Sequence, residues 1–438
     1  MKKCLLFVFV AVFLPVFMYS QQDYSFEEIL VRAKKEIDTL CSATFAGRGY
    51  IDQGHIKAAD YIEGRFREMG LKAIVGVKEN PDYKQPFLLN INLITDATLI
   101  IDGDTLAPGR DFIVNRFSGS GNLSGKIADL GYGITAPKKP LKGKIILIRS
   151  GFPPEIANDS ERLKTYQQVA NVNDRIGSLM EYNPSAVVVI EKKLTAGFSR
   201  EQYPIPVLEV RAEILPAKMR TAELSVKAAP TQILSQNVLG LVRGKIHSDT
   251  VVIICAHYDH LGKLGKAVFT GANDNASGTA MLLSLAEYFA DPLHQPDYSL
   301  LFIAFGGEET GLTGSDFYAN HQPMIPLKQT KFVLNLDLMG NGIDGIMAVG
   351  GIDFPAHFQR LVSLNDSLKA VPVVRSRKNA PNSDHYYFLQ KGVPGFFIYT
   401  LGGPPHYHDV NDNPSTIELS KYAEIRALLL RFLETINH

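Results

Sequence analysis

Short apolar runs alternate with segments of helical periodicity throughout the second half of the chain, and this alternation limits the possible folds most. After Asn237 the runs and segments are, in order, 251–256, a helix over 276–290, 299–305, 332–338, a helix after Phe354, 396–399 and a helix from Ser415. Strands that are apolar throughout are covered on both faces, and their alternation with helices is typical of an α/β sheet. The sequence therefore predicts an α/β fold with a mixed sheet flanked by helices on both faces.

The first half of the chain has a different pattern. Apolar residues recur at helical spacing over 56–69, and an apolar run at 87–94 predicts a strand. From about Asp96 to about Thr231, short β-rich runs are separated by Gly and Pro, which favours a small inserted domain. The expected division is 1–20 as a signal peptide, 21–95 and 232–438 as the catalytic domain, and 96–231 as the insertion. The insertion has few clustered His or carboxylate residues, so we expect no chemistry in it.

The first twenty residues predict export. Lys2 and Lys3 precede an apolar run over 5–17, and the small residue Ser20 is followed by polar sequence. This is the pattern of a signal peptide, and the run is shorter than the ~20 residues that a membrane-spanning helix needs. We expect cleavage near Ser20, a periplasmic or secreted protein, and no membrane span after removal of the signal.

Charge and cysteine content exclude other classes. Lys+Arg and Asp+Glu both total 45, so the formal net charge is +0 and a nucleic-acid partner is not expected. Cys41 and Cys255 are too few for a disulfide scaffold, and we predict buried thiols. Oligomeric state is not predicted.

Residues of metal-ligand type follow the predicted strands. They are His257 after 251–256, Glu308 and Glu309 after 299–305, Asp337 at the end of 332–336, and His406 and His408 after 396–399. Sites in open α/β sheets lie where strands end, so we expect these side chains to converge.

Each motif also has an alternative interpretation. In AHYDHLG at 256–262, the Asp259 carboxylate can accept a hydrogen bond from or near His257 and fix its tautomer. In GANDNASG at 271–278, Asp274 either caps a helix or bridges two cations. Asp337 lies in an apolar strand and needs a metal ion, an Arg or backbone amides as its partner. In PHYHD at 405–409, spacing does not choose between His406 and His408.

Glu308 and Glu309 provide the sharpest signal. They form GGEETGL at 306–312, and adjacent carboxylates after a buried strand repel each other unless each has a cation or a proton. Because adjacent side chains do not easily aim at one point, we assign Glu309 to a metal ion and Glu308 to proton transfer.

Together these motifs, with AGRG at 46–49 and SQNVLG at 235–240, resemble the di-zinc aminopeptidase family that includes glutamate carboxypeptidase, the transferrin receptor and glutaminyl cyclase. The resemblance implies one zinc ion on His257 and Asp337 and a second on Glu309 and His408. It further implies that Asp274 bridges the two ions.

The resemblance assigns further roles. It implies that Glu308 is the general base, that Asp259 lies behind the ligands, and that the peptide after Asp274 is strained and can be cis. His408 is preferred to His406 because the family's ligand precedes a short turn ending in an acidic residue, here Asp412. The region 96–231 resembles a protease-associated domain. The segment SDH at 383–385 and its surroundings suggest a substrate pocket, with Asp384, His385 and Tyr407 as the predicted substrate-binding residues.

The sequence departs from the family pattern at Asp409 and Asn413, where Thr is expected, which bears on substrate preference. The predicted function is a metallo-aminopeptidase in which a water between two zinc ions is deprotonated by Glu308. One rival is a carboxypeptidase or dipeptidase that would use Arg375 or Arg377 to hold a terminal carboxylate. Another is a non-catalytic binding protein, which the complete ligand set disfavours.

Overall fold

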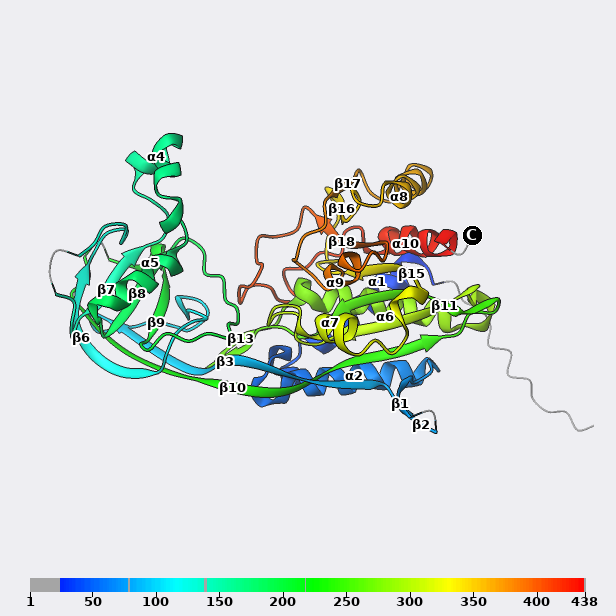
Figure 1. Cartoon of the computed structure of the whole chain (residues 1–438), viewed down its shortest axis with the longest axis horizontal. Helices are drawn as coiled ribbons and strands as arrows, with labels where there is room; N and C mark the ends of the chain where they lie inside the picture. Colours follow the sequence, from blue (N-terminus) through cyan, green and yellow to red (C-terminus); the bar gives the residue numbers. More distant parts are fainter. Residues whose placement is uncertain (1–23, 78, 138–139, 217, 437–438) are drawn as a thin grey trace, which may run out of the picture.

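A computed structural model of the protein describes residues 24–77, 79–137, 140–216 and 218–436. The predicted signal peptide lies outside the described residues. Within them, none of the helices combines the length and the apolar character needed to cross a bilayer. Two lobes make up the molecule, and the long strands β3 (Lys84–Ile101) and β10 (Thr221–Val242) run from one lobe into the other (Figure 1).

The larger lobe contains a mixed sheet. Its strand order is β17-β16-β18-β15-β11-β14-β10. Strands β14, β11, β15 and β18 run parallel, whereas β10 and β16 pair antiparallel to them. Their bounds are β11 His247–His257, β14 Tyr298–Phe305, β15 Thr330–Leu336, β16 Gly345–Val349, β17 Val374–Arg377 and β18 Gly395–Leu401. The predicted mixed α/β sheet is confirmed.

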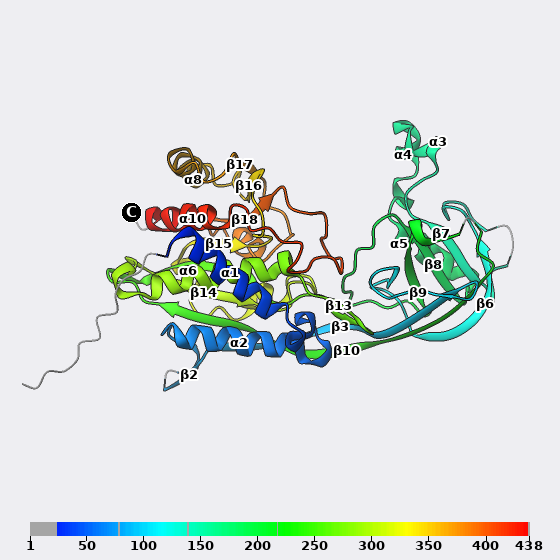
Figure 2. The same cartoon turned by 180° about the vertical axis from the view of Figure 1, so that it is seen from behind.

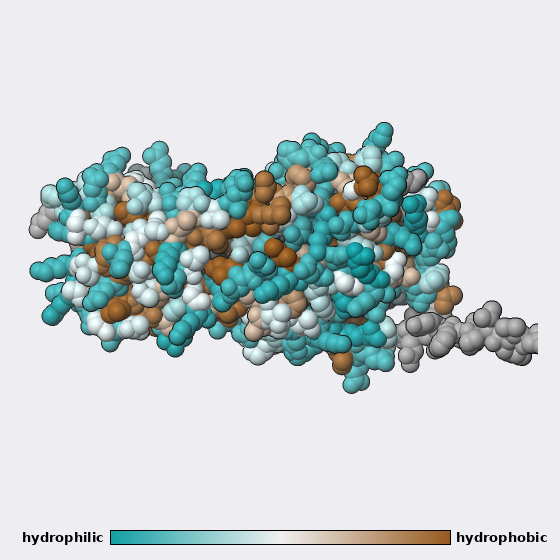
Figure 3. Space-filling model, turned by 90° about the horizontal axis from the view of Figure 1, so that it is seen from below, coloured by the Kyte–Doolittle hydropathy of each residue, from teal (hydrophilic) through white to brown (hydrophobic). Residues whose placement is uncertain are grey.

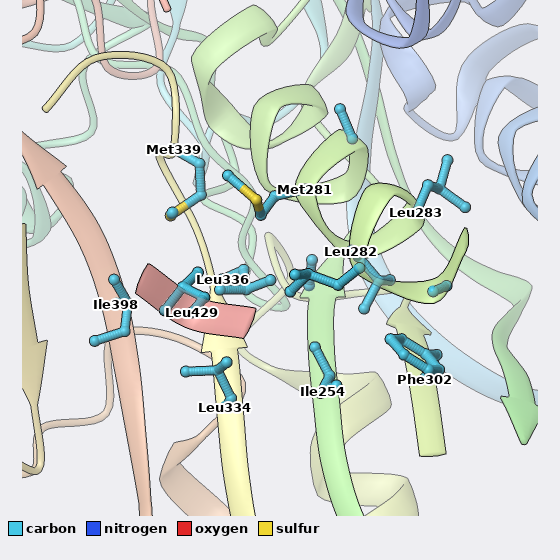
Figure 4. Packing of buried hydrophobic residues seen from close by; sticks show 14 of the residues in the cluster. Ile254, Met281, Leu282, Leu283, Phe302, Leu334, Leu336, Met339, Ile398 and Leu429 are labelled. Carbon is cyan, nitrogen blue, oxygen red and sulfur yellow. The ribbon is translucent and has the colours of Figure 1, made fainter. Parts of the chain in front are cut away.

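Helices cover both faces because successive side chains of the buried strands point in opposite directions. On one face, Ile254, Phe302 and Leu334 pack with several helices in a single apolar cluster, part of which is shown in Figure 4. These helices are α1 (Phe26–Leu40), α2 (Gly54–Glu68), α6 (Gly278–Ala290), α8 (Pro355–Leu368) and α10 (Tyr422–Ile436). On the other face, Ile253 and Ile303 pack against α9 (Tyr386–Gln390) and the helical turn that follows α7 (Thr313–Asp316).

The smaller lobe is built on a parallel sheet of its own. Strands β6 (Gly121–Asp129), β7 (Ile145–Arg149), β8 (Ala186–Glu191) and β9 (Val207–Arg211) pair in that order, and β5 (Phe112–Val114) adds an antiparallel edge. Helices α3 (Pro154–Ala157), α4 (Ser160–Thr165) and α5 (Val172–Leu179) lie between β7 and β8 in the chain. The remaining strands are short: β1 (Val75–Val77), β2 (Asn80–Asp82), β4 (Asp104–Thr105), β12 (Gly262–Leu264) and β13 (Ala267–Phe269).

The two lobes share backbone pairing. Strand β3 pairs with β10 from one lobe to the other, and β6 of the smaller lobe also pairs with β10 (Figures 1 and 2). The expected domain boundaries at 96 and 231 therefore fall inside continuous strands. Apolar side chains gather in the middle of the face seen from below (Figure 3), and on these strands Leu88 and its register partner Leu234 are each 58% exposed.

Two predicted element ends differ from the structure. The last helix begins at Tyr422 rather than Ser415, because the Asn413 side chain accepts hydrogen bonds from the Ser415 backbone and hydroxyl and holds a turn there. Strand β15 ends at Leu336, and the chain turns sharply at Leu338, whose φ of 54° lies in the left-handed region. Asp337 therefore stands just past the strand, facing the end of the sheet.

Candidate metal centre and active site

The predicted ligands converge where four parallel strands end. His257 is the last residue of β11, Glu309 follows β14, Asp337 follows β15 and His408 lies in the loop after β18. Asp274 comes from the turn that leads into α6, and the peptide bond after it is cis, which is one of the forms that the resemblance allows.

Asp274 lies between the two imidazoles. The His257 Nε2 is 3.3 Å from Asp274 Oδ1 and 3.4 Å from Asp337 Oδ1. The His408 Nε2 is 3.3 Å from Asp274 Oδ2 and 3.0 Å from Glu309 Oε2. Each carboxylate oxygen of Asp274 thus faces a different ligand pair. These contacts select His408 from the two candidate histidines of its loop.

The arrangement fits zinc. Ligand atoms bound tetrahedrally at about 2.0–2.2 Å from zinc stand about 3.3–3.6 Å from one another, which is the range of most of these separations. The side chains of His257, Asp274 and Glu309 are at most 3% exposed. Among the described residues, Asp274 Oδ2 and Asp337 Oδ1 face only the Nε2 atoms of His408 and His257, at 3.3 and 3.4 Å, and make no well-aligned hydrogen bond. Buried carboxylate oxygens without well-aligned donors require a cation, so this donor set suits a pair of metal ions.

The imidazoles stabilise the negative charge of the ligand carboxylates and thereby lower their pKa values. Burial raises the pKa of Asp274, but hydrogen bonds from His257 and His408 outweigh it and hold the pKa well below its ordinary value. Burial also raises the pKa of Glu309, and the charge of His408 overcomes it and brings the pKa to about 2. The carboxylates thus favour protons on the imidazoles. Metal ions would displace those protons.

Asp259 acts differently from the prediction. Its main-chain oxygen lies 3.2 Å from His257 Nδ1, whereas its carboxylate is 3.9 Å away. The carbonyl, rather than the carboxylate, therefore fixes the His257 tautomer and leaves Nε2 for a metal ion. The carboxylate instead accepts hydrogen bonds from the Tyr50 hydroxyl at 3.0 Å and from the Glu308 backbone N–H at 3.2 Å. The Asp259 carboxylate thus holds the loop after β14 that carries Glu308.

Several supporting residues were not assigned a role from the sequence. The His260 Nδ1 lies 2.7 Å from Glu309 Oε1, and the Ser383 hydroxyl donates to Asp337 Oδ2 at 2.9 Å. The Asp412 carboxylate accepts the backbone N–H groups of Asn273 and Asp274. Each contact orients a ligand from behind. His260 could have been suspected, because it belongs to the same short motif as His257.

Arg48 ties two ligand loops together. This side chain is fully buried, and its guanidinium donates to the main-chain oxygens of Tyr258 at 2.8 Å, Thr270 at 2.6 Å and Gly271 at 2.8 Å. Tyr258 follows His257, and Gly271 precedes Asp274. The AGRG motif that contributed to the resemblance therefore fixes the distance between these two ligands.

The predicted substrate-binding residues separate into two groups. Asp384 and His385 are fully buried, and burial raises the pKa of Asp384 to about 7 and lowers that of His385 to about 3. The charges of His257, Asp259 and Asp337 act on Asp384, so it lies near the ligands, and substrate contact by Asp384 or His385 stays a prediction. Tyr407 is 49% exposed, and its ring stacks on His408 with centroids 3.9 Å apart. It stays a predicted substrate contact.

Two imidazoles and two further carboxylates around one shared aspartate form a donor set that is typical of metal-dependent hydrolases. The model of peptidase family M28 matches residues 237–433, the part of the chain that supplies all five of these side chains. Residues 237–433 belong to peptidase family M28, which confirms the predicted family and the prediction of a peptidase.

Relatives extend this likeness to both lobes. Aminopeptidase YwaD of Bacillus subtilis (strain 168) is 28% identical over 336 residues, which cover 72% of this chain and 68% of that protein. The structure of BSAP, a zinc aminopeptidase from Bacillus subtilis, superposes with a TM-score of 0.67 at 22% identity and covers 92% of this chain and 93% of its own. An aminopeptidase from Aneurinibacillus sp. strain AM-1 gives a TM-score of 0.63 at 23% identity and 92% coverage of both chains. The two structures establish the shared fold.

Removal of the Arg48 charge should destabilise the protein strongly. We expect Arg48→Met to lower the free energy of unfolding by about 3–5 kcal/mol, because several buried carbonyl oxygens lose their donor at about 1–3 kcal/mol each. The matched control is Arg431→Met, since Arg431 is 65% exposed and its pair with Glu434 should contribute at most about 1 kcal/mol. Urea denaturation measures both, and equal small losses would contradict the assigned role.

Proposed function

We propose that the protein is an exported two-zinc aminopeptidase that releases residues from the free N-termini of peptides. The observation that carries this proposal is the position of Asp274, whose two oxygens lie 3.3 Å from His257 Nε2 and 3.3 Å from His408 Nε2. The names of the bacterial relatives, an aminopeptidase and a zinc aminopeptidase, support the same activity.

The chain offers two zinc positions. His257 and Asp337 would hold one ion, Glu309 and His408 would hold the other, and Asp274 would bridge them. When bound, the ions supply Lewis-acid polarisation of the scissile carbonyl and lower the pKa of a water molecule towards neutrality. His257, Glu308 and Asp337 also offer ligand-type atoms within 4.8 Å of one another, so Glu308 reaches the same space.

Glu308 is the proposed general base. Burial raises its pKa well above the ordinary value; the charge of His257 opposes this shift, and nearby Glu309 adds to it. A carboxylate with a raised pKa is a stronger base than an ordinary one. In the proposed reaction, Glu308 removes a proton from the attacking water and delivers it to the nitrogen of the leaving amine. The Asp259 carboxylate holds the Glu308 backbone in place for both transfers.

The residues near the site favour action at an N-terminus over action at a C-terminus. A carboxypeptidase or dipeptidase would need a free cation here. Arg375 is exposed, and the Arg377 guanidinium carbon lies 5.5 Å from the centre of the Tyr399 ring, where it stacks on an aromatic face. The proposal therefore favours aminopeptidase action.

Replacement of the general base should stop turnover without loss of metal. We expect Glu308→Gln to lower kcat by about 10²–10⁴-fold, because the amide does not accept the proton from water. Zinc content should stay at the wild-type value, since Glu308 is not among the proposed ligands. Steady-state kinetics with metal analysis measures both. Near-normal turnover with zinc still bound would remove Glu308 from this role.

A free α-amine should be required. We expect cleavage of N-terminally unblocked peptides, loss of cleavage when the same peptides are acetylated, and loss of activity after chelation that zinc restores. Cleavage from the C-terminus of the acetylated peptides would instead support the carboxypeptidase alternative. A protein that binds no zinc and cleaves neither set would support the non-catalytic alternative.

Export is proposed from the N-terminal sequence alone. Expression of the full chain in a bacterium with two membranes should deliver a mature protein to the periplasm or the medium, with its N-terminus near Gln21. N-terminal sequencing of the purified protein measures this. Retention of Met1 in cytoplasmic protein would contradict it.

A further inference from the structure

The smaller lobe contacts the loop that carries His408. The His408 Nδ1 lies 2.8 Å from the main-chain oxygen of Ala196, and the Ala196 N–H donates back to the His408 main-chain oxygen at 3.1 Å. A carbonyl oxygen only accepts hydrogen bonds, so Nδ1 must carry the proton in this contact. The smaller lobe thereby fixes the tautomer that directs Nε2 towards Asp274 and Glu309.

The backbone of His408 needs this support. Its φ is 56°, in the left-handed region that residues with a side chain adopt at a cost. Such a conformation persists when neighbouring contacts over-determine it. The paired hydrogen bonds with Ala196 supply contacts of this kind on the side of the loop that faces the smaller lobe.

A partly buried ion pair makes the second contact. The Arg211 Nη2 lies 3.4 Å from Asp409 Oδ2, and the Asp409 side chain is 5% exposed. Arg211 stands at the end of β9, where its Nε donates to the main-chain oxygen of Arg110 at 3.0 Å. The other Asp409 oxygen accepts hydrogen bonds from the Asn411 backbone and amide. Asp409, unexpected in the family pattern, thus has a partner from the smaller lobe.

Apolar side chains also pack between the His408 loop and the smaller lobe. Val410 packs in the cluster formed by Phe112 and Leu194 of the smaller lobe and by Leu261 and Phe269 of the larger one. Gly109 lies so close to this loop that an added Cβ would stand 2.6 Å from Val410 Cγ1. Strand β12, which begins two residues after His260, is therefore packed against the smaller lobe as well.

We propose that the inserted region is part of the metal centre. Arg211 is a positioning residue: through Asp409, and together with the Ala196 carbonyl, it holds His408 and sets the zinc affinity of the position shared by His408 and Glu309. This inference rests on the proposed two-zinc function. It corrects the expectation that the inserted region has no part in the chemistry.

The test is zinc affinity. Wild type, Arg211→Met, isosteric Asp409→Asn and the double variant are equilibrated in a series of zinc buffers, and bound zinc per chain is measured. We expect each single variant to lower the affinity for one of the two zinc ions by about tenfold to a hundredfold, as is usual when a group behind a metal ligand is removed. The affinity for the other zinc ion should stay unchanged. The double variant should be no weaker than either single variant, because both lose the same pair.

The matched control is Arg149→Met, which breaks the 2.7 Å pair between Arg149 and Asp129 within the same lobe. It should keep both zinc affinities. Arg211→Lys retains the charge and should lose less affinity than Arg211→Met. Unfolding midpoints of the zinc-free proteins show whether each variant is folded, and Asp409→Asn and Arg211→Lys carry the test if Arg211→Met does not fold.

Two results would overturn the inference. One is a wild-type protein with two zinc ions whose affinities are unchanged in the folded variants. The other is a loss of zinc affinity from Asp409→Asn that is as large in the Arg211→Met background as in wild type. Such a loss would come from the charge of Asp409 alone and not from its pair with Arg211. A wild-type protein without zinc would overturn the proposed function itself, and the inference with it.

Discussion

Buried negative charge governs the structure of this protein. Carboxylates gather at one end of the larger sheet, and those with shifted pKa values there are Asp259, Asp274, Glu308, Glu309, Asp337, Asp384 and Asp412. The imidazoles that face them are His257, His260 and His408. Carboxylates in low dielectric repel one another unless protons or cations neutralise them. Protons on the imidazoles or bound metal ions must therefore compensate this set, and metal ions would also provide the basis of the proposed catalysis.

The fold uses rigid parts to keep these side chains together. Parallel strands bring His257, Glu309 and Asp337 to a common edge, and the apolar clusters on both faces prevent the strands from shifting. Arg48 then fixes the distance between the loops of His257 and Asp274. Only His408 comes from a long loop, and that ligand is held from the smaller lobe. The continuous strands β3 and β10 connect the two lobes on which the centre depends.

The sequence predicted the features that follow from local pattern. Strands that end in His257, Glu309 and Asp337 are recognisable because an apolar run stops at a charged residue, and parallel strands must present those ends together. Glu308 and Glu309 drew attention because adjacent carboxylates cannot both be buried without compensation. The family resemblance contributed the choice of His408 over His406, which spacing did not make.

Contacts between distant residues were not predictable in this way. Arg48 reaches Thr270 across 222 positions, and His408 reaches Ala196 across 212. Main-chain oxygens accept both hydrogen bonds, and any residue type provides such an acceptor. Asp259 was assigned the right neighbourhood but the wrong atom for the same reason. The sequence predicted no chemistry in the inserted region, because the contribution that we propose for it is one carbonyl and one arginine, neither of which forms a motif.

Anomalous diffraction at the zinc edge from crystals of the purified protein tests the central claim most directly. The account predicts two zinc peaks per chain, about 3.5–4 Å apart, with one oxygen of Asp274 on each. One ion should also contact His257 and Asp337, and the other Glu309 and His408. A single peak, no peak, or two peaks that do not share Asp274 would contradict it.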